Sequence, residues 1–193
     1  SETGESFTIE ARVVINAAGV WADDIRRLDT ATAPGQLAPS QGAHLVIDRD
    51  FLPGDAALLI PKTSDGRVLF IIPWQGKVLL GTTDTPRHET LLEPRPLASE
   101  IDFILDTAAR YLSRPPGRAD VRSAFAGLRP LINASQGGAT SALSREHVIQ
   151  VSGSGLVSVA GGKWTTYRHM AHQIIDRAEL AGHLPARPCP TAT

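Results

Sequence analysis

Cysteine and lysine are scarce in this sequence, and long apolar runs are missing from it. Cys189 is the single cysteine among 193 residues, which excludes an intramolecular disulfide bond and favours a reducing compartment. No apolar run is long enough to span a bilayer. The formal net charge is −1 and no basic block is interleaved with aromatics, which argues against a general nucleic-acid binder. With 42% hydrophobic and 20% charged residues, the composition is typical of a globular chain of one domain or two small ones.

Signatures of three common classes of site are also absent. Gly153 and Gly155 begin a dinucleotide-binding Gly-x-Gly-x-x-Gly pattern, but Ser158 stands at the third glycine position and the segment continues as a strand. No Gly-x-Ser-x-Gly elbow of a serine hydrolase occurs. His169 and His172 are three residues apart on a predicted helix, but no Glu or Cys is placed to complete a metal shell. We therefore predict no metal site.

The hydrophobic pattern predicts many short strands and a few helices. Apolar residues at 101, 104, 105, 108 and 112 recur at helical spacing, and hairpin turns are expected at Asp65-Gly66, Gln75-Gly76 and residues 152–155. The predicted strands are 7–16, 43–48, 57–61, 68–74, 77–83, 119–131 (broken near Gly127), 146–151 and 156–160; the predicted helices are 20–29, 97–112 and 165–181. This order indicates an α+β fold with a mostly antiparallel or mixed sheet and flanking helices.

The most informative segment is 159–168, in which an apolar strand ends in Gly161-Gly162 and a helix opens after Lys163. The two glycines allow close approach of a ligand to the backbone. The N–H groups of the first helical turn and the charge of Lys163 suit an anion or the electron-rich edge of a ring. The alternative is a plain Gly-Gly turn into a capped surface helix.

Arg129 and His44 are the next candidates. Arg129 stands among apolar neighbours and before a proline, so its charge needs an anionic partner: a structural carboxylate, or a bound phosphate or carboxylate substrate. Arg145 is a second arginine of this kind, with Glu146 as a local partner. His44 follows Gly42 at the start of a strand, where an ordinary hydrogen-bonded core histidine is the alternative to a functional one. Asp84 closes a hydroxyl-rich strand end that is either a turn or the rim of a ligand site.

Seven ordered runs of the sequence together resemble the FAD-dependent glycerol-3-phosphate dehydrogenase family. These runs are residues 14–21, 40–44, 69–74, 81–85, 125–131, 143–147 and 159–168. Glycine-oxidase-like and D-amino-acid-oxidase-like flavoenzymes share the Asn-Ala-Ala-Gly turn at 16–19, whereas the Leu-Arg-Pro and Gly-Gly-Lys-Trp-Thr-Thr runs favour the phosphate-specific branch. Val20 stands where the family normally has proline.

The resemblance implies oxidation of sn-glycerol 3-phosphate to dihydroxyacetone phosphate, with FAD as hydride acceptor and a quinone as final electron acceptor. It implies Arg129 as the phosphate anchor, Arg145 as a weaker second, and His44 in contact with substrate. The general base is either His44, whose ordinary pKa suits that role at neutral pH, or Lys163 if burial lowers its pKa, and the sequence does not decide between them. The implied FAD contacts are Ala18, Gly19, Trp21, Gly42, Asp84, Gly161, Gly162, Lys163, Trp164 and Thr165. A deaminating amino-acid oxidase of the same superfamily is the competing enzyme.

The resemblance also predicts a domain organisation. Residues 1–40 are expected to belong to an FAD-binding domain, 41–155 to the substrate domain, 156–182 to a return segment of the FAD domain, and 183–193 to a linker or tail. The family's phosphate-cradling glycines and a helical C-terminal domain have no counterpart here, so we expect a middle piece of a longer protein. Taken alone, it would be a non-catalytic module without FAD. For the parent protein we expect a cytoplasmic location, peripheral contact with the inner face of the cell membrane, and possible homo-oligomerisation.

Overall fold

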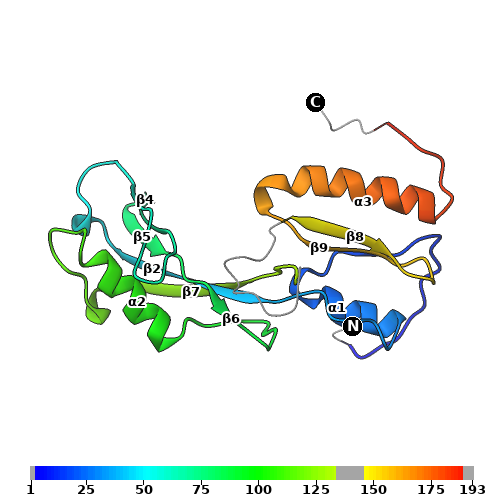
Figure 1. Ribbon diagram of the computed structural model, residues 1–193, viewed down its shortest axis with the longest axis horizontal. Coiled ribbons are helices and arrows are strands. Elements are labelled where there is room, and N and C mark those ends of the chain that lie inside the picture. Colours follow the sequence, from blue (N-terminus) through cyan, green and yellow to red (C-terminus); the bar gives the residue numbers. More distant parts are fainter. Residues whose placement is uncertain (1–2, 134–145, 189–193) are drawn as a thin grey trace. The chain divides into compact units, whose positions relative to one another are not determined.

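The computed structural model of the chain describes residues 3–133 and 146–188, and it divides into two compact units. The first unit comprises Ser1–Leu37 and Ser144–Thr193, and the second comprises Ala38–Leu143. Each unit is built on its own sheet (Figure 1). Among the described residues, no helix combines the length and the apolar character needed to cross a membrane.

The sheet of the first unit has three strands in the order β1-β9-β8. β1 (Ile15–Asn16) pairs in parallel with β9 (Val157–Gly161), and β8 (His147–Val151) pairs with β9 in antiparallel fashion. The helical elements are η1 (Gly19–Trp21), α1 (Ala22–Asp29), η5 (Trp164–Thr166) and α3 (Tyr167–Ala181). Ile174 and Ala178, one turn apart on α3, pack on Val157 and form the buried core of this unit.

The larger sheet belongs to the second unit and has the order β3-β4-β5-β2-β6. β5 and β6 pair with successive parts of one edge of β2, and β7 pairs with the opposite edge. Its strands are β2 (Ser40–Asp48), β3 (Leu58–Ile60), β4 (Leu69–Trp74), β5 (Lys77–Gly81), β6 (Thr85–Pro86) and β7 (Ser123–Arg129). α2 (Ala98–Ala108) covers one face, and two short helical turns, η2 (Arg49–Phe51) and η3 (Arg118–Asp120), complete the unit. All of these strand pairs are antiparallel.

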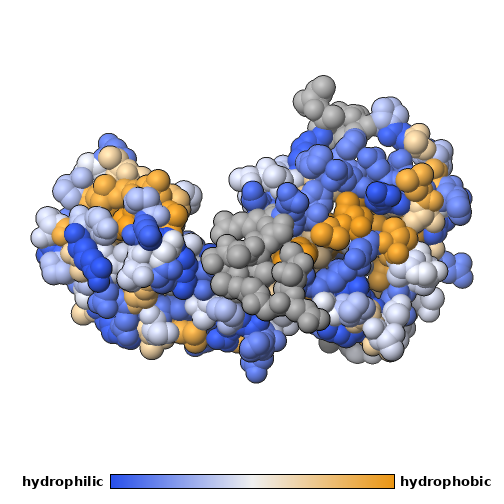
Figure 2. Space-filling model, in the orientation of Figure 1, coloured by the Kyte–Doolittle hydropathy of each residue, from blue (hydrophilic) through white to orange (hydrophobic). Residues whose placement is uncertain are grey.

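Alternation over residues 43–48 of β2 separates the two faces of this sheet. Ala43, Leu45 and Ile47 are buried, together with Ile104 and Ala108 of α2. The opposite face carries one cross-strand row, in which the register places in line Leu59, Phe70, Gly81, His44 and Phe125. Leu59, Phe70 and Phe125 are 58%, 43% and 48% exposed, and Figure 2 shows apolar residues gathered over β4 and β5. In the part of the chain that the structure describes, the face opposite to α2 therefore carries a row of exposed apolar side chains beside His44.

The predicted α+β class is confirmed, and most predicted elements are present with shifted ends. The predicted strand 7–16 is wrong over residues 7–14: Phe7 and Ile9 are both 76% exposed, and only Ile15 and Asn16 pair with a strand among the described residues. Alternation alone does not make a strand, because the backbone also needs a partner for its hydrogen bonds. β7 is continuous through Gly127, which pairs with Gly42, and residues 118–120 form a helical turn.

β8 lies in the first unit, whereas the predicted substrate domain, which stays a prediction, runs to residue 155. Residues 147–151 form β8, which pairs with β9 by hydrogen bonds. The turn at 152–155 joins the two strands. The ring Nε2 of His147 on β8 also lies 2.6 Å from Oε1 of Gln173 on α3. Residues 147–155 consequently belong to the first unit, because a hairpin strand stays with its partner strand.

Candidate functional site

Arg129 lies at the end of β7, and its guanidinium group crosses the open face of β2. An added Cβ at Gly42 would lie only 2.6 Å from Cζ and 2.7 Å from Nη1 of Arg129. No side chain larger than hydrogen fits at position 42 without displacing the guanidinium group. The neighbouring glycine of the register pair, Gly127, has no such contact. Gly42 therefore provides the space in which Arg129 lies.

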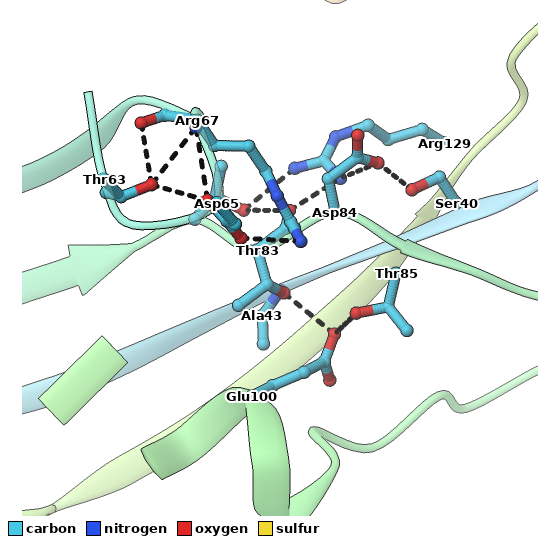
Figure 3. A network of polar contacts seen from close by, with 11 residues as sticks. Ser40, Ala43, Thr63, Asp65, Arg67, Thr83, Asp84, Thr85, Glu100 and Arg129 are labelled. Carbon is cyan, nitrogen blue, oxygen red and sulfur yellow. Dashed lines mark hydrogen bonds and ion pairs between the residues drawn. The ribbon is translucent and has the colours of Figure 1, made fainter. Parts of the chain in front are cut away.

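The strand end that follows β5 fixes the orientation of this guanidinium group. Nη1 of Arg129 donates a hydrogen bond to the carbonyl oxygen of Thr83 (3.0 Å), and Nη2 donates one to Oγ1 of Thr82 (2.8 Å). Asp84 Oδ1 lies 3.7 Å from Nη1 and accepts a hydrogen bond from the Ser40 hydroxyl. Figure 3 shows Arg129, Asp84 and Ser40 meeting beside Thr83. Arg129 thus has the structural carboxylate partner that was one of its two expected roles; binding of a phosphate or carboxylate substrate stays a prediction.

His44 lies on the same face of β2 as Arg129. Its register neighbours are Gly81 and Phe125, and its ring stacks on that of Phe125 with centroids 5.3 Å apart. An added Cβ at Gly81 would collide with the His44 ring, 2.9 Å from Cγ, so a glycine again provides the space. Burial, and secondarily the positive charge of Arg129, hold the pKa of His44 below its ordinary 6.5. At neutral pH the imidazole is neutral and able to accept a proton.

Behind this face, the buried carboxylate of Glu100 supports the same strand end. It is 3% exposed, and it accepts hydrogen bonds from four donors: Thr83 Oγ1 (2.8 Å), Thr85 Oγ1 (2.7 Å), Gln41 Nε2 (2.6 Å) and Leu97 N (2.8 Å). Burial raises the pKa of Glu100, but these hydrogen bonds outweigh burial and hold the pKa below the ordinary value. Thr83 thus binds Glu100 with its hydroxyl and Arg129 with its carbonyl (Figure 3).

The second group of predicted residues lies in the first unit, at the end of β9. Gly161 and Gly162 have φ values of +77° and +86°, in the left-handed region that favours glycine. An added Cβ at Gly162 would also collide with the side chain of Met170. Lys163 and Trp164 are exposed, and the Trp164 ring stacks on Tyr167 with centroids 5.3 Å apart. The segment therefore places the backbone of two glycines next to the exposed positive charge of Lys163.

Ala18, Gly19 and Trp21 form the turn that joins β1 to α1. Asn16, 3% exposed, organises this turn: its side chain accepts from Ala18 N (3.2 Å) and donates to Ala22 O (2.9 Å) and to Ser158 Oγ on β9 (3.2 Å). Gly19 has φ +60°, and η1 contacts β9. The structure therefore brings the two predicted FAD-contacting segments of the first unit onto the same strand pair.

The structure sorts the remaining predicted residues as follows. Arg145 lies outside the described residues. Asp84, predicted as an FAD contact, lies beside Arg129 in the second unit together with Gly42 and His44. The helix predicted from Thr165 begins with the short turn η5, so α3 itself starts at Tyr167. The base role considered for Lys163 depends on burial, whereas the side chain is exposed.

Two residues of the candidate site, Thr82 and Glu100, were not predicted from the sequence. Thr82 belongs to a hydroxyl-rich run that was noticed, but nothing in the run shows which hydroxyl binds Arg129. Glu100 had a readable signal: it stands one turn before Ile104, so an acid falls on the apolar side of the predicted helix and needs hydrogen-bond donors there. Among the described residues, no group of three or more His, Cys, Asp or Glu is arranged to hold a metal.

Comparison with known proteins places this geometry in a family. The model of the DAO family, described as FAD dependent oxidoreductase, matches residues 1–168. The chain is 44% identical over 191 residues to the mitochondrial glycerol-3-phosphate dehydrogenase of Mesocricetus auratus and 43% identical over 190 residues to that of Arabidopsis thaliana. These matches cover 98% of this chain in both cases, but only 26% and 30% of the relatives.

A solved structure gives the same result in three dimensions. The glycerol-3-phosphate dehydrogenase from Bacillus halodurans, complexed with FAD, superposes with a TM-score of 0.84 at 38% sequence identity. The match covers 99% of this chain and 36% of that chain, so the chain spans about a third of the length of that relative. The family match covers more than half of the chain, and the chain belongs to the family of FAD-dependent oxidoreductases.

Proposed function

We propose that this chain supplies the substrate-binding sheet and a flavin-edge segment of an enzyme that oxidises sn-glycerol 3-phosphate to dihydroxyacetone phosphate. The observation that carries the proposal is that Arg129 and a neutral His44 lie on the same face of β2. Each of these side chains occupies space that a glycine leaves free, Gly42 for Arg129 and Gly81 for His44. The similarity to glycerol-3-phosphate dehydrogenases of an animal, a plant and a bacterium supports the same substrate.

Arg129 suits the phosphate end of this substrate. A guanidinium group presents N–H donors in a planar fork that matches phosphate oxygens, and the charge-assisted hydrogen bonds that result are strong. Asp84 offsets part of the positive charge of Arg129, so a ligand has to bring more negative charge than a neutral polyol has. We therefore expect discrimination between glycerol 3-phosphate and glycerol at this residue.

His44 suits the reacting end. Its ring is neutral at neutral pH, so one ring nitrogen can accept the proton of the C2 hydroxyl group as the C2 hydrogen leaves as hydride. FAD, when bound, supplies the hydride acceptor. Stacking on Phe125 and contact with Gly81 restrict the rotation of the imidazole, which keeps it oriented toward the open face.

The segment 161–165 fits an FAD edge. Gly162 has a positive φ, and the space that a side chain would occupy there is filled by Met170, so both features favour glycine at this turn. Lys163 adds a positive charge that would stabilise negative charge on the reduced flavin. Ala18, Gly19 and Trp21, on the turn beside β9, are the other residues that we propose to hold it. We further propose that the first unit belongs to the FAD-binding domain and that the second unit is the substrate domain.

The acceptor, the membrane contact and the assembly are further parts of the proposal. We infer a quinone acceptor, peripheral contact with the inner face of the cell membrane, a cytoplasmic location, and homo-oligomerisation, all from the family resemblance. Arg145 stays a proposed second phosphate ligand. Fractionation of cells that make the full-length gene product tests the membrane contact; recovery of all activity in the cytosol, with oxygen as the natural oxidant, would contradict it.

A substrate screen of the full-length gene product tests the proposed reaction. With an artificial electron acceptor, we expect turnover of sn-glycerol 3-phosphate and none of glycerol. Activity on glycine or D-alanine with none on the phosphate ester would instead establish the deaminating amino-acid oxidase. Replacing Arg129 by Ala should raise KM for glycerol 3-phosphate at least tenfold, since a charge-assisted hydrogen bond contributes about 1.5–3 kcal/mol.

A further inference from the structure

We propose that Gly42 and Thr82 are positioning residues that set the affinity of the site for phosphate by fixing the guanidinium group of Arg129. The inference rests on the proposed function, and it assigns roles to two residues that need not touch the substrate. Gly42 controls where the guanidinium group lies, and Thr82 controls how it is turned.

The role of Gly42 is steric. The guanidinium group lies where a Cβ of residue 42 would be, within 2.7 Å of that point at Nη1. Real Cβ contacts are never this short, so any side chain at position 42 pushes the end of Arg129 away from β2. The backbone of Gly42 does not have a positive φ, so alanine leaves the strand itself unstrained. Substitution at Gly42 is therefore a way to move Arg129 while keeping its charge.

The role of Thr82 is to restrict the rotation of the Arg129 guanidinium group. A guanidinium group bound at Nη1 alone can turn about that contact, whereas bonds at Nη1 and Nη2 fix its plane. The carbonyl oxygen of Thr83 supplies the first contact at 3.0 Å and the hydroxyl of Thr82 the second at 2.8 Å. Thr83 is in turn fixed by Glu100 and by the N–H of Ala43, so the first contact is rigid. The Thr82 contact is made by a side chain, so it can be removed by substitution while the backbone contact to Thr83 stays in place.

The phosphate of glycerol 3-phosphate does not react, so contacts to it act equally on bound substrate and transition state. Loss of such contacts raises KM and leaves kcat nearly unchanged. Removing the Thr82 hydroxyl lets the guanidinium group turn, so binding of phosphate has to immobilise it. KM for glycerol 3-phosphate should therefore rise about two- to tenfold, as expected when a long side chain is ordered on binding. The inhibition constant for inorganic phosphate should rise by the same factor, because phosphate probes the anion site without the reacting carbon.

The experiment compares five variants of the full-length holoenzyme: Thr82→Val, Thr82→Ser, Gly42→Ala, Gly127→Ala and Arg129→Ala. Valine keeps the shape of threonine without its hydroxyl, and serine restores the hydroxyl. Gly127 is the matched control, because it pairs with Gly42 across the strands and an added Cβ there meets no atom of the described residues within 4 Å. We expect Thr82→Val and Gly42→Ala to raise KM and the phosphate inhibition constant together, with kcat within about twofold of the parent. Thr82→Ser and Gly127→Ala should behave as the parent.

The outcomes separate two failures. If Arg129→Ala leaves KM unchanged, Arg129 is not the phosphate anchor and the proposed function loses its main support. If Arg129→Ala raises KM but Thr82→Val and Gly42→Ala do not, the anchor stands and the positioning roles are wrong. Equal effects of Gly42→Ala and Gly127→Ala would also overturn the steric argument. Should Gly42→Ala fail to fold, the Thr82 pair decides alone.

Discussion

Replacing Glu100 by Gln tests the role of this buried carboxylate in the second unit. Each carboxylate oxygen accepts two hydrogen bonds: Oε1 from the hydroxyls of Thr83 and Thr85, and Oε2 from Gln41 and the backbone N–H of Leu97. Glutamine has nearly the same shape, but it turns one of these oxygens into an NH₂ group that faces two donors. The amide takes the orientation in which its NH₂ group faces the Thr83 and Thr85 hydroxyls, because these can turn and accept. The bonds to Glu100 then lose their charge assistance, so the variant should lose about 1–3 kcal/mol of unfolding free energy.

Urea denaturation followed by circular dichroism measures this loss, and hydrogen exchange with mass spectrometry assigns it to a unit. We expect faster exchange in β2, β5 and α2 and unchanged exchange in β9 and α3. Asp106→Asn is the matched control, because Asp106 lies on the same helix but is exposed. A loss below 1 kcal/mol, or faster exchange confined to the first unit, would refute the reasoning.

The same residue predicts a pH dependence. Because the folded-state pKa of Glu100 is below its ordinary value of 4.5, its contribution is present above that value and is lost as pH falls through the lower, folded-state pKa. The difference in stability between the parent and Glu100→Gln should therefore be full at neutral pH and shrink in acid. A difference that grows as pH falls would contradict the assigned direction of the pKa shift.

Three further predictions address other parts of the chain. The Asp48 carboxyl, which binds Arg122 and Lys77 and has its pKa lowered to about 2, should show that value by NMR titration and move toward 3.8 in Arg122→Gln; an unchanged value would remove Arg122 as a cause. Gly162→Ala should lower FAD retention by the full-length gene product, because the new Cβ meets Met170 in a positive-φ backbone, whereas Gly153→Ala, with open space, should not. The 193-residue chain alone should purify colourless, because its sequence has no dinucleotide-binding glycine motif; stoichiometric bound FAD in an absorbance scan would contradict this.

Much of the fold could be predicted from the sequence, because the hydrophobic pattern of several segments matches the face that each segment buries. Alternation in β2 and the helical spacing of Ile104 and Ala108 follow directly from their shared core. Residues 7–14 alternate equally well and yet form no strand, because pairing depends on distant segments that a local pattern does not contain. The parallel pairing of β1 with β9 and the place of β8 in the first unit are likewise long-range facts.

The site was predictable to a similar degree. Arg129, His44 and the Gly161-Gly162 pair could be selected from residue type and neighbours. Their supports could not, since Thr82 and Gly42 contact Arg129 only through a strand register that joins residues far apart in the chain. Asp84 illustrates the same limit: its run was noticed, but its position beside Arg129 follows from the turn after β5.

Anaerobic reduction of bound FAD by sn-glycerol 3-phosphate, followed by stopped-flow absorbance, tests the central claim most directly. In the full-length gene product we expect rapid bleaching that saturates with glycerol 3-phosphate and none with glycerol or glycine. In Arg129→Ala the concentration for half-saturation should rise at least tenfold, in line with the loss of a charge-assisted contact. Bleaching by glycine or D-alanine but not by glycerol 3-phosphate, or a half-saturation concentration unaffected by Arg129→Ala, would contradict the account.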